Sequence, residues 1–432
     1  MDLKTALNRG GAPVLATALS LSLLAGCASD SAGQQPDTEG ATVNLVYAFD
    51  GLFTEPFGEI TSDLESRTGM TVDLQLAGNS YEDSLARLQN DLTAGNPPDI
   101  TMVGLNQVRM LADAGAAVPL GEFIESDDEF DSGQYSQEML DLTTIDGEMY
   151  GMPNAVSTLV MYYNADVFAE AGLDPDAPPQ TWEEVEEDAR AIVESDAATY
   201  GHWSDFESVW SFENFLRSNG GSMMDDTETD IAFNDAPGVE VLEYWRGMVE
   251  SGLMPAFGTD DGREAFFRGD VAMAVDSSAQ VGNYERTAGF DMRTAMLPIP
   301  ADGERQAPGG GNALVITATD PERQRLAWEA LKAFVGPEGS TTTTEATGYL
   351  PVNAYAAESD EYLAEFLDGS PNRAVVLEQG TSSLVPWFSW PGERGPEIAE
   401  ELQNGIYRAV SGEQPPQDAL DQAADAAAEL LP

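Results

Sequence analysis

The feature that most constrains the fold of this chain is an alternation of strand and helix patterns between residues 42 and 103. Residues 42–48 and 70–76 carry apolar side chains at every second position, which is typical of half-buried strands. After each of them, apolar residues recur at helical spacing up to a glycine that can end a helix. A third strand follows at 100–103. This order and spacing favour parallel pairing with right-handed crossovers, so the sequence predicts an α/β lobe.

A second lobe is predicted to begin after residue 153. An apolar strand is expected at 158–163 and a short helix at 165–171. Thr181 and Glu184 have the spacing of a capping box, which starts a further helix. Three other elements follow from apolar patterns, namely strands at 271–275 and 313–317 and a surface helix from residue 416.

The N-terminus has the pattern of an export signal. Lys4 and Arg9 precede an apolar stretch at 14–24 that is too short to span a bilayer as a mature helix. The stretch ends in Leu-Ala-Gly-Cys, which resembles the lipobox of bacterial lipoproteins, where the thiol of the cysteine is acylated. Residues 1–26 are therefore predicted to be a lipoprotein signal peptide and Cys27 the lipidation site. An ordinary signal peptide with a chance cysteine is the alternative.

Composition limits the partners of the mature chain. Cys27 is the only cysteine, so a disulfide framework is excluded. Residues 27–41 are small and polar and are predicted to be a flexible linker. The chain has 76 acidic and 19 basic residues and a net charge of −57, which repels nucleic acid and anionic lipid. The acidic residues are scattered in small clusters, which favours a solvated surface over a metal site.

Several segments, in this order, resemble the bacterial extracellular solute-binding proteins of ATP-driven importers, in the branch that binds carbohydrates and glycerol-3-phosphate. They are residues 78–83 and 94–100, 161–168, 171–174 and 181–184, 267–273, and 347–352. The resemblance implies a type II periplasmic-binding-protein-like fold, with two α/β lobes and a hinged cleft. Chain order then predicts that lobe one takes 42–153 plus 276–312, and that lobe two takes 154–275 plus 313–432.

The resemblance also implies a function. The chain is expected to be the lipid-anchored substrate-binding component of an ABC importer, closing its lobes on a sugar or oligosaccharide and delivering it to the permease. It is expected to be a monomer at the extracellular face of the cell membrane, held there only by its lipid anchor, with no cofactor, metal or nucleic-acid partner. One alternative ligand is glycerol-3-phosphate or a glycerophosphodiester, and a secreted carbohydrate-active enzyme is a third hypothesis.

Sugars present apolar ring faces and many hydroxyls, so a sugar site needs aromatic platforms and short polar side chains. Trp203 and Trp210 lie in a stretch without helical amphipathicity, and Trp387 and Trp390 lie in a segment with proline at both ends. These four tryptophans are candidates for stacking on a ligand. For each of them, a position in the core is the alternative.

Further candidates follow from matching positions with the glycerol-3-phosphate branch. They are Tyr81, Ser157, Ser277, Ser278, Gly310, Gly311 and Tyr349. The glycines at 309–311 either offer backbone N–H groups to a ligand or form a plain turn. The phosphate-pairing arginine of the relatives aligns near Gly392, two positions from Arg394, and their acidic residue after the third strand is replaced near Gly104. Loss of a bidentate donor weakens phosphate recognition, so a neutral sugar is predicted.

An enzymatic role is not expected. His202 is the only histidine, so a metal cluster or a Ser-His-Asp triad would have to be built on it alone. No phosphate-loop motif or nucleophile elbow occurs. A glycosidase needs only two carboxylates, so that reaction stays open. We interpret His202 as a cleft or surface residue.

Overall fold

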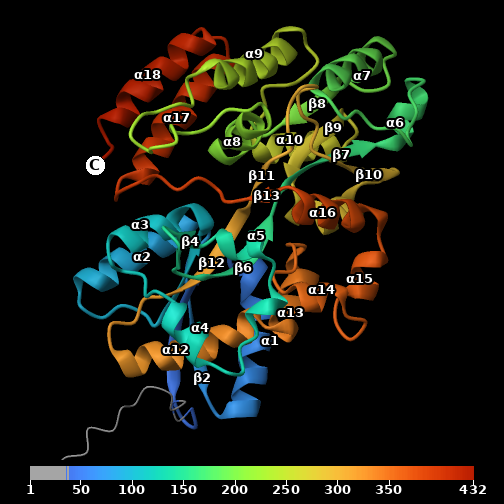
Figure 1. Ribbon diagram of the computed structural model, residues 1–432. Helices are drawn as coiled ribbons and strands as arrows, with labels where there is room; N and C mark the ends of the chain where they lie inside the picture. The colour runs from blue at the N-terminus through green and yellow to red at the C-terminus, as the bar shows by residue number, and fades with distance from the viewer. Residues whose placement is uncertain (1–35, 37) are drawn as a thin grey trace, which may run out of the picture. The chain divides into compact units, whose positions relative to one another are not determined.

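The computed structural model describes Pro36 and residues 38–432 (Figure 1). The predicted signal peptide and Cys27 lie outside the described residues. Among those that are described, no helix is both long enough and apolar enough to span a membrane.

The first lobe is built on a five-stranded sheet with the order β2-β1-β3-β12-β6. Its strands are β1 (Thr42–Ala48), β2 (Thr71–Gly78), β3 (Ile100–Gly104), β6 (Met152–Ser157) and β12 (Gly310–Ile316). β1 pairs in parallel with both β2 and β3, whereas β12 is antiparallel to β3 and to β6. The predicted parallel arrangement of the first three strands is therefore confirmed.

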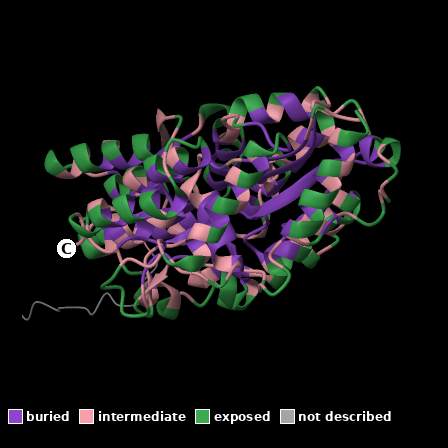
Figure 2. Cartoon of the chain, turned by 90° about the horizontal axis from the view of Figure 1, so that it is seen from above, coloured by how far each residue is buried: buried purple, intermediate pink, exposed green. Residues whose placement is uncertain are grey.

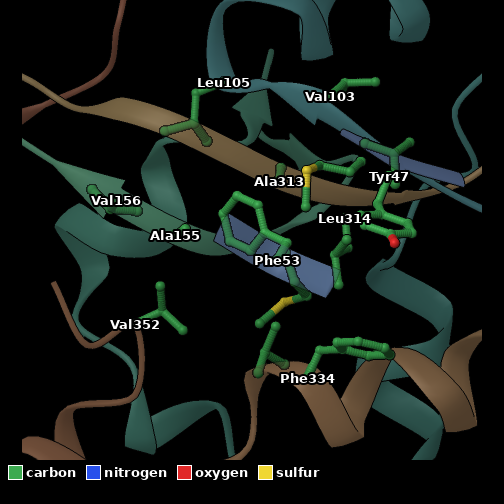
Figure 3. Packing of buried hydrophobic residues seen from close by; sticks show 14 of the residues in the cluster. Tyr47, Phe53, Val103, Leu105, Ala155, Val156, Ala313, Leu314, Phe334 and Val352 are labelled. Atoms are coloured by element: carbon green, nitrogen blue, oxygen red, sulfur yellow. The ribbon is translucent and has the colours of Figure 1, made fainter. Parts of the chain in front are cut away.

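Helices from two separate stretches of the chain, residues 50–113 and 321–347, cover this sheet. They are α1 (Asp50–Thr68), α2 (Tyr81–Thr93), α3 (Val108–Asp113), α12 (Pro321–Val335) and α13 (Pro337–Thr347). Phe53 of α1 and Phe334 of α12 pack with Tyr47 of β1 and Leu314 of β12 in one apolar core (Figure 3). The core thus joins residues almost 300 positions apart in sequence, which ties α12 and α13 to the first lobe.

Short elements complete this lobe. They are η1 (Leu105–Gln107), α4 (Gly121–Ser126), η2 (Ser132–Gln134), α5 (Gln137–Asp141), β4 (Thr144–Ile145) and β5 (Glu148–Met149). η1 follows β3 without an intervening loop. Of these short elements, η1 contributes residues to the lining of the cavity described below.

The second lobe is built on a four-stranded sheet with the order β10-β7-β9-β8. Its strands are β7 (Leu159–Asn164), β8 (Tyr200–Ser204), β9 (Val271–Ser277) and β10 (Met292–Met296). Leu159, Met161 and Tyr163 pack in one apolar cluster, and Val160 and Tyr162 pack in the other. Alternate residues of β7 therefore face opposite sides, and both sides are buried, as the purple strands of Figure 2 show.

Helices pack against both faces of this sheet. The helices of this lobe are α6 (Ala165–Glu170), α7 (Trp182–Glu194), α8 (Val209–Ser218), α9 (Ala236–Glu250), α10 (Thr259–Phe267), η3 (Ser278–Gln280), α11 (Val281–Thr287), α17 (Gly395–Val410) and α18 (Pro416–Ala428). Thr181 and Glu184 form the predicted capping box at the start of α7. The predicted C-terminal surface helix is α18, which packs on α17 and α9.

The chain passes between the two sheets at Thr158, which separates β6 from β7. Thr158 N donates to Ser278 Oγ at 3.0 Å, and Ser278 N donates back to the Thr158 carbonyl at 2.8 Å. β11 (Ala307–Pro308) and β13 (Leu384–Val385) pair in parallel and are drawn between the sheets in Figure 1. Three helices connect α13 to β13, namely α14 (Ala354–Glu358), α15 (Ala364–Asp368) and α16 (Pro371–Ser382).

Strand pairing corrects the predicted lobe boundaries. The range 276–312 was expected to return to the first lobe, but β10 lies inside it and pairs with β7 of the second sheet. β12, which was assigned to lobe two from residue 313, instead pairs with β3 and β6 of the first sheet. The reason is physical. The apolar run at the end of β12 does not indicate which sheet the strand joins, and β10 carries Arg293 and Thr294 and so shows no apolar run at all.

Candidate ligand-binding cleft

A cavity of about 520 Å³ lies between the two lobes, and we call it the cleft cavity. The first lobe contributes Glu82, Asn106, Gln107 and Met110. The second lobe contributes Asp205, Glu207, Ser208, Val209, Trp210, Glu213, Met223, Thr259, Trp387, Phe388, Trp390, Gly395, Pro396, Ala399, Glu400 and Gln403. The second lobe thus supplies all the aromatic side chains of the lining and most of the acidic ones.

On the first-lobe wall, Gln107 is bonded to its own neighbours, whereas the side-chain amide of Asn106 makes no hydrogen bond to the described residues. Gln107 Oε1 accepts a hydrogen bond from Gly104 N at 3.1 Å, and its Nε2 donates to Glu82 Oε1 at 3.4 Å. At the start of α2, Asp83 and Ser80 form a capping box. These side chains hold the ends of β2 and β3 in short turns, so few of their hydrogen-bonding groups remain for a ligand.

The aromatic part of the second-lobe wall is fixed by the strands between the lobes. Trp210 lies in the first turn of α8, and its Nε1 donates to the Pro308 carbonyl of β11 at 2.8 Å. A Cβ atom at Gly310 would lie 2.6 Å from the Trp210 ring, so the absence of a side chain there makes room for the indole. The Trp210 and Trp387 ring centroids are 6.1 Å apart at 52°. The two rings form a corner rather than a stack.

A second aromatic pair continues this wall. The Phe388 and Trp390 rings are 4.9 Å apart and nearly perpendicular, and Trp390 also meets Phe233 edge-on. Trp390 is buried and therefore supports the wall more than it presents a free face.

Two buried carboxyl groups lie in the same wall. Glu213 Oε1 accepts from Phe388 N at 3.0 Å and lies 3.7 Å from Arg217 Nε, while Glu213 Oε2 has no hydrogen-bond partner. Asp205 Oδ2 accepts from Thr259 Oγ1 at 3.0 Å, and Asp205 Oδ1 is likewise buried without a partner. Burial raises the pKa of Glu213 to about 7, and burial together with the charge of Asp276 raises the pKa of Asp205 to about 6.

The two lobes touch beside the cavity. Ser389 Oγ donates to the Asn106 carbonyl at 2.6 Å, and Gly392 N donates to Asp113 Oδ2 at 3.2 Å. Arg109 Nη2 is 2.6 Å from Glu228 Oε2, which forms an ion pair between the lobes. The lobes are thus held against each other along this edge of the cleft.

The structure brings three of the four candidate tryptophans to the cleft cavity, namely Trp210, Trp387 and Trp390. Trp203 does not line it. Its side chain is fully buried in β8, its Nε1 donates to the Phe257 carbonyl at 3.1 Å, and Gly262 lies against its ring. The alternative of a core position therefore holds for Trp203. Its expected role as a ligand platform is corrected, because its strand is covered by helices on both faces.

Arg394 lies outside the lining. It is half-exposed just before α17 and pairs with Glu397 in the first turn of that helix. Its neighbours Gly395 and Pro396 line the cavity, but the guanidinium does not.

The candidates taken from the glycerol-3-phosphate branch gather around the crossing between the sheets rather than in the cavity lining. They are Tyr81, Ser157, Ser277, Ser278, Gly310, Gly311 and Tyr349. Gly310 pairs with Ser157 in the sheet, so the glycines lie in a strand and the expected turn is absent there. Gly311 has φ 113°, and a Cβ atom would lie 2.0 Å from the Ala155 carbonyl, so close strand approach requires glycine.

The two candidate tyrosines meet each other near this crossing. Tyr81 OH accepts from Asn312 Nδ2 at 3.3 Å, and burial together with the neighbouring Tyr349 raises the pKa of Tyr81 well above its usual value. Tyr349 lines a second, smaller cavity of about 240 Å³ together with Arg286.

His202 is neither in the cleft nor at the surface, so that expectation is corrected. It is buried in β8 with Nε2 2.8 Å from Ser204 Oγ, and burial lowers its pKa to about 3. Because burial disfavours the charged form, the neutral imidazole is more stable here than the imidazolium. In the part of the chain that the structure describes, no group of His, Cys, Asp or Glu could hold a metal ion.

Sequence reasoning missed Asp205, Glu213, Phe388 and the first-lobe lining. One signal was present, because Glu213 follows Trp210 by three positions and so shares its helical face. Asp205 directly follows β8, at the end of a strand that pairs in parallel with β9, where α/β proteins commonly place site residues.

A family model described as bacterial extracellular solute-binding protein matches residues 59–365. The chain belongs to this family. Since the family comprises solute-binding proteins, the protein is a binding protein and not an enzyme.

Curated relatives of this solute-binding protein include the sn-glycerol-3-phosphate-binding periplasmic protein UgpB of Pectobacterium atrosepticum. It is 28% identical over 374 residues, which is 82% of either chain. The Escherichia coli K12 protein of the same name is 28% identical over 371 residues, covering 82% of this chain and 84% of its own.

Solved structures give the same fold. The cyclic α-maltosyl-1,6-maltose binding protein of Arthrobacter globiformis superposes with a TM-score of 0.76 at 26% identity, covering 90% of this chain and 98% of its own. UgpB of Mycobacterium tuberculosis, in complex with glycerophosphocholine, has a TM-score of 0.80 at 21% identity with the same coverage. The two-lobed periplasmic-binding fold predicted from the sequence is thus confirmed.

Proposed function

We propose that this solute-binding protein binds a sugar or oligosaccharide in the cleft cavity and delivers it to the permease of an ABC importer. The observation that carries the proposal is the corner formed by Trp210 and Trp387, which lies in the lining of a cavity rich in hydrogen-bond acceptors. Apolar ring faces and hydroxyl donors are what a sugar requires.

Closure of the lobes is the proposed mechanism. Residues of both lobes line the cavity, so a ligand there contacts both and stabilises the closed state over the open one. Ser389 and Gly392 contact the first lobe beside the cavity, and we expect closure on a ligand to keep these contacts. The permease would then recognise the closed surface.

Glycerol-3-phosphate or a glycerophosphodiester is the second candidate, supported by the similarity to the sn-glycerol-3-phosphate-binding proteins of Pectobacterium atrosepticum and Escherichia coli. The lining argues against it, because it includes carboxyl groups and no Lys, Arg or His. An anionic phosphate would lack the charged donors that normally bind it and would face several like charges.

The experiment is a thermal-shift screen of the purified protein at pH 7, confirmed by calorimetry. Glucose, cellobiose, maltose and maltotetraose are compared with glycerol-3-phosphate and glycerophosphocholine. We expect at least one sugar to raise the melting temperature, since a ligand that binds only the folded state stabilises it. Stabilisation by the phosphate compounds alone would contradict the sugar assignment and favour the second candidate.

We also propose that Cys27 carries a lipid anchor that holds a monomeric receptor at the extracellular face of the membrane. The basis is the sequence Leu24-Ala25-Gly26-Cys27 after an apolar stretch. Cys27→Ser should move the protein from the detergent phase to the aqueous phase in a partition assay, because a hydroxyl cannot form the thioether. A variant that stays in the detergent phase would refute the anchor.

A further inference from the structure

The charge of the cleft cavity is one-sided. Its acidic residues are Glu82, Asp205, Glu207, Glu213 and Glu400, and no basic side chain lines it. In a chain of net charge −57, exposed carboxylates such as Glu82 and Glu400 are expected on any surface. The buried carboxyl groups are not explained by surface composition.

Glu213 is the most unusual of them. Its residue is fully buried, yet Oε2 has no hydrogen-bond partner, and its one neighbouring cation, Arg217, lies 3.7 Å from the other oxygen, Oε1. A buried acceptor without a partner destabilises a fold, and such groups are rare unless a function requires them. Since Glu213 also lines the cavity, the natural partner of Oε2 is a ligand.

Aromatic residues line the same part of the cavity as this carboxyl group. Trp210 precedes it by one turn on α8, and the backbone N–H of Phe388, next to Trp387, donates to its Oε1. A carboxylate and the face of an indole both attract a cation and both disfavour an anion. A neutral hydroxyl can donate to Oε2, whereas an ammonium group supplies a donor together with a charge that favours the ionised carboxylate.

We propose that the ligand is an amino sugar, whose protonated amine binds Glu213 Oε2 beside Trp210 and Trp387 while its ring stacks on one of the indoles. This inference rests on the proposed sugar-binding function and narrows its substrate class. Burial raises the pKa of Glu213 to about 7, so the carboxyl group is only partly ionised at pH 7 without a ligand, and a bound cation would shift it to the ionised form.

The test uses matched triplets in calorimetry at pH 7, each consisting of an amino sugar, its N-acetyl form and its hydroxyl form. Glucosamine, galactosamine and the β-1,4-linked glucosamine disaccharide head the three triplets. In at least one of them, we expect the amino sugar to bind about tenfold tighter than both neutral forms or better, the scale of one desolvated cation–π contact. If no amino sugar binds tighter than its neutral forms, the proposal is overturned.

Glu213→Gln identifies the residue responsible, because the amide keeps the shape and one acceptor but removes the charge. The variant should reduce the preference for the amino form to near unity, whereas Glu401→Gln, a neighbouring carboxylate on α17 outside the lining, should keep it. A preference that survives Glu213→Gln contradicts the proposal. Neutral sugars that bind without any amino preference refute this inference alone, and binding of glycerophosphates without any sugar refutes the proposed function as well.

Discussion

The two walls of the cleft cavity are built from similar α/β lobes but differ in chemistry. On the first-lobe wall, Gln107 pairs with Gly104 and Glu82, and only the side-chain amide of Asn106 has no partner among the described residues. On the second-lobe wall, Asp205 and Glu213 each keep a buried oxygen without a partner. The hydrogen-bonding capacity left for a ligand therefore lies mainly on the second lobe.

The length of the connections explains this difference. In the first lobe, α2 begins two residues after β2, and η1 directly follows β3. Polar side chains in these short connections hydrogen-bond to the backbone at the start of the next helix. In the second lobe, residues 205–208 separate β8 from α8, and residues 386–394 separate β13 from α17. Longer segments can present large aromatic side chains without breaking a helix or strand. We infer that the second lobe determines ligand choice and that the first lobe closes over it.

The largest expected effect concerns the charge buried in the second-lobe wall. Between about pH 4.5 and 7, folded Glu213 retains a proton that the unfolded chain has released, so its contribution to stability falls as the pH rises through this window. Glu213→Gln should therefore gain stability relative to the unmodified protein by up to about 3 kcal/mol over this range. Urea unfolding at a series of pH values measures the difference. A stability difference between Glu213→Gln and the unmodified protein that does not change with pH in this window would contradict the raised pKa of Glu213.

The aromatic side chains give the next largest effect. Trp387→Ala should weaken sugar binding about ten- to a hundredfold, since a lost stacking platform is worth about 1–3 kcal/mol. Trp210→Ala should do the same, but it also removes the hydrogen bond to Pro308, so Trp387 is the cleaner test. Tyr407→Ala, an exposed aromatic of α17 outside the lining, is the control in calorimetry. If both tryptophan variants bind sugar normally, the inference that the second-lobe wall selects the ligand is wrong.

A smaller effect is expected where the two walls meet. Arg109→Ala removes the ion pair with Glu228, and a partly exposed pair of this kind contributes up to about 1 kcal/mol. The variant should be more open without ligand, with a larger radius of gyration in small-angle scattering, and should bind sugar up to about fivefold more weakly. Arg67→Ala, which breaks an ion pair inside α1, is the control. An unchanged radius and affinity would show that the pair does not hold the lobes together.

The smallest effect is expected on the first-lobe wall. Glu82 is exposed, so Glu82→Gln should change sugar affinity less than about threefold in calorimetry. A tenfold loss would mean that the first lobe also selects the ligand.

The sequence predicted the elements whose signals are local. β1, α1, β2, α2 and β3 follow from apolar periodicity and end signals such as Gly69, which adopts φ 74° after α1. Trp387 was predicted to face a ligand because prolines flank its segment, and it lines the cavity. Trp210 also lines the cavity, but it does so from the first turn of the amphipathic helix α8, so the lack of helical amphipathicity from which it was predicted is wrong. That either tryptophan binds a ligand stays a prediction.

Other features depend on long-range packing. The lobe that β12 joins is decided by pairing with strands more than 150 residues away, which the apolar run itself does not encode. Trp203 was interpreted as a loop residue because β8 is short and almost fully buried. Such a strand does not show the alternation of apolar and polar residues that identifies a half-buried strand. Glu213 was missed because one carboxyl group in a buried helix face has no pattern of its own until the fold places it beside Phe388.

The central claim is that the ligand binds in the cleft cavity against the second-lobe wall. A crystal structure of the protein with the tightest-binding sugar of the screen locates the ligand directly. We expect a sugar ring in van der Waals contact with Trp210 or Trp387 and a donor within about 3.2 Å of Glu213 Oε2 or Asp205 Oδ1. A sugar bound instead in the smaller cavity beside Tyr349, or held only by first-lobe residues, would contradict the account.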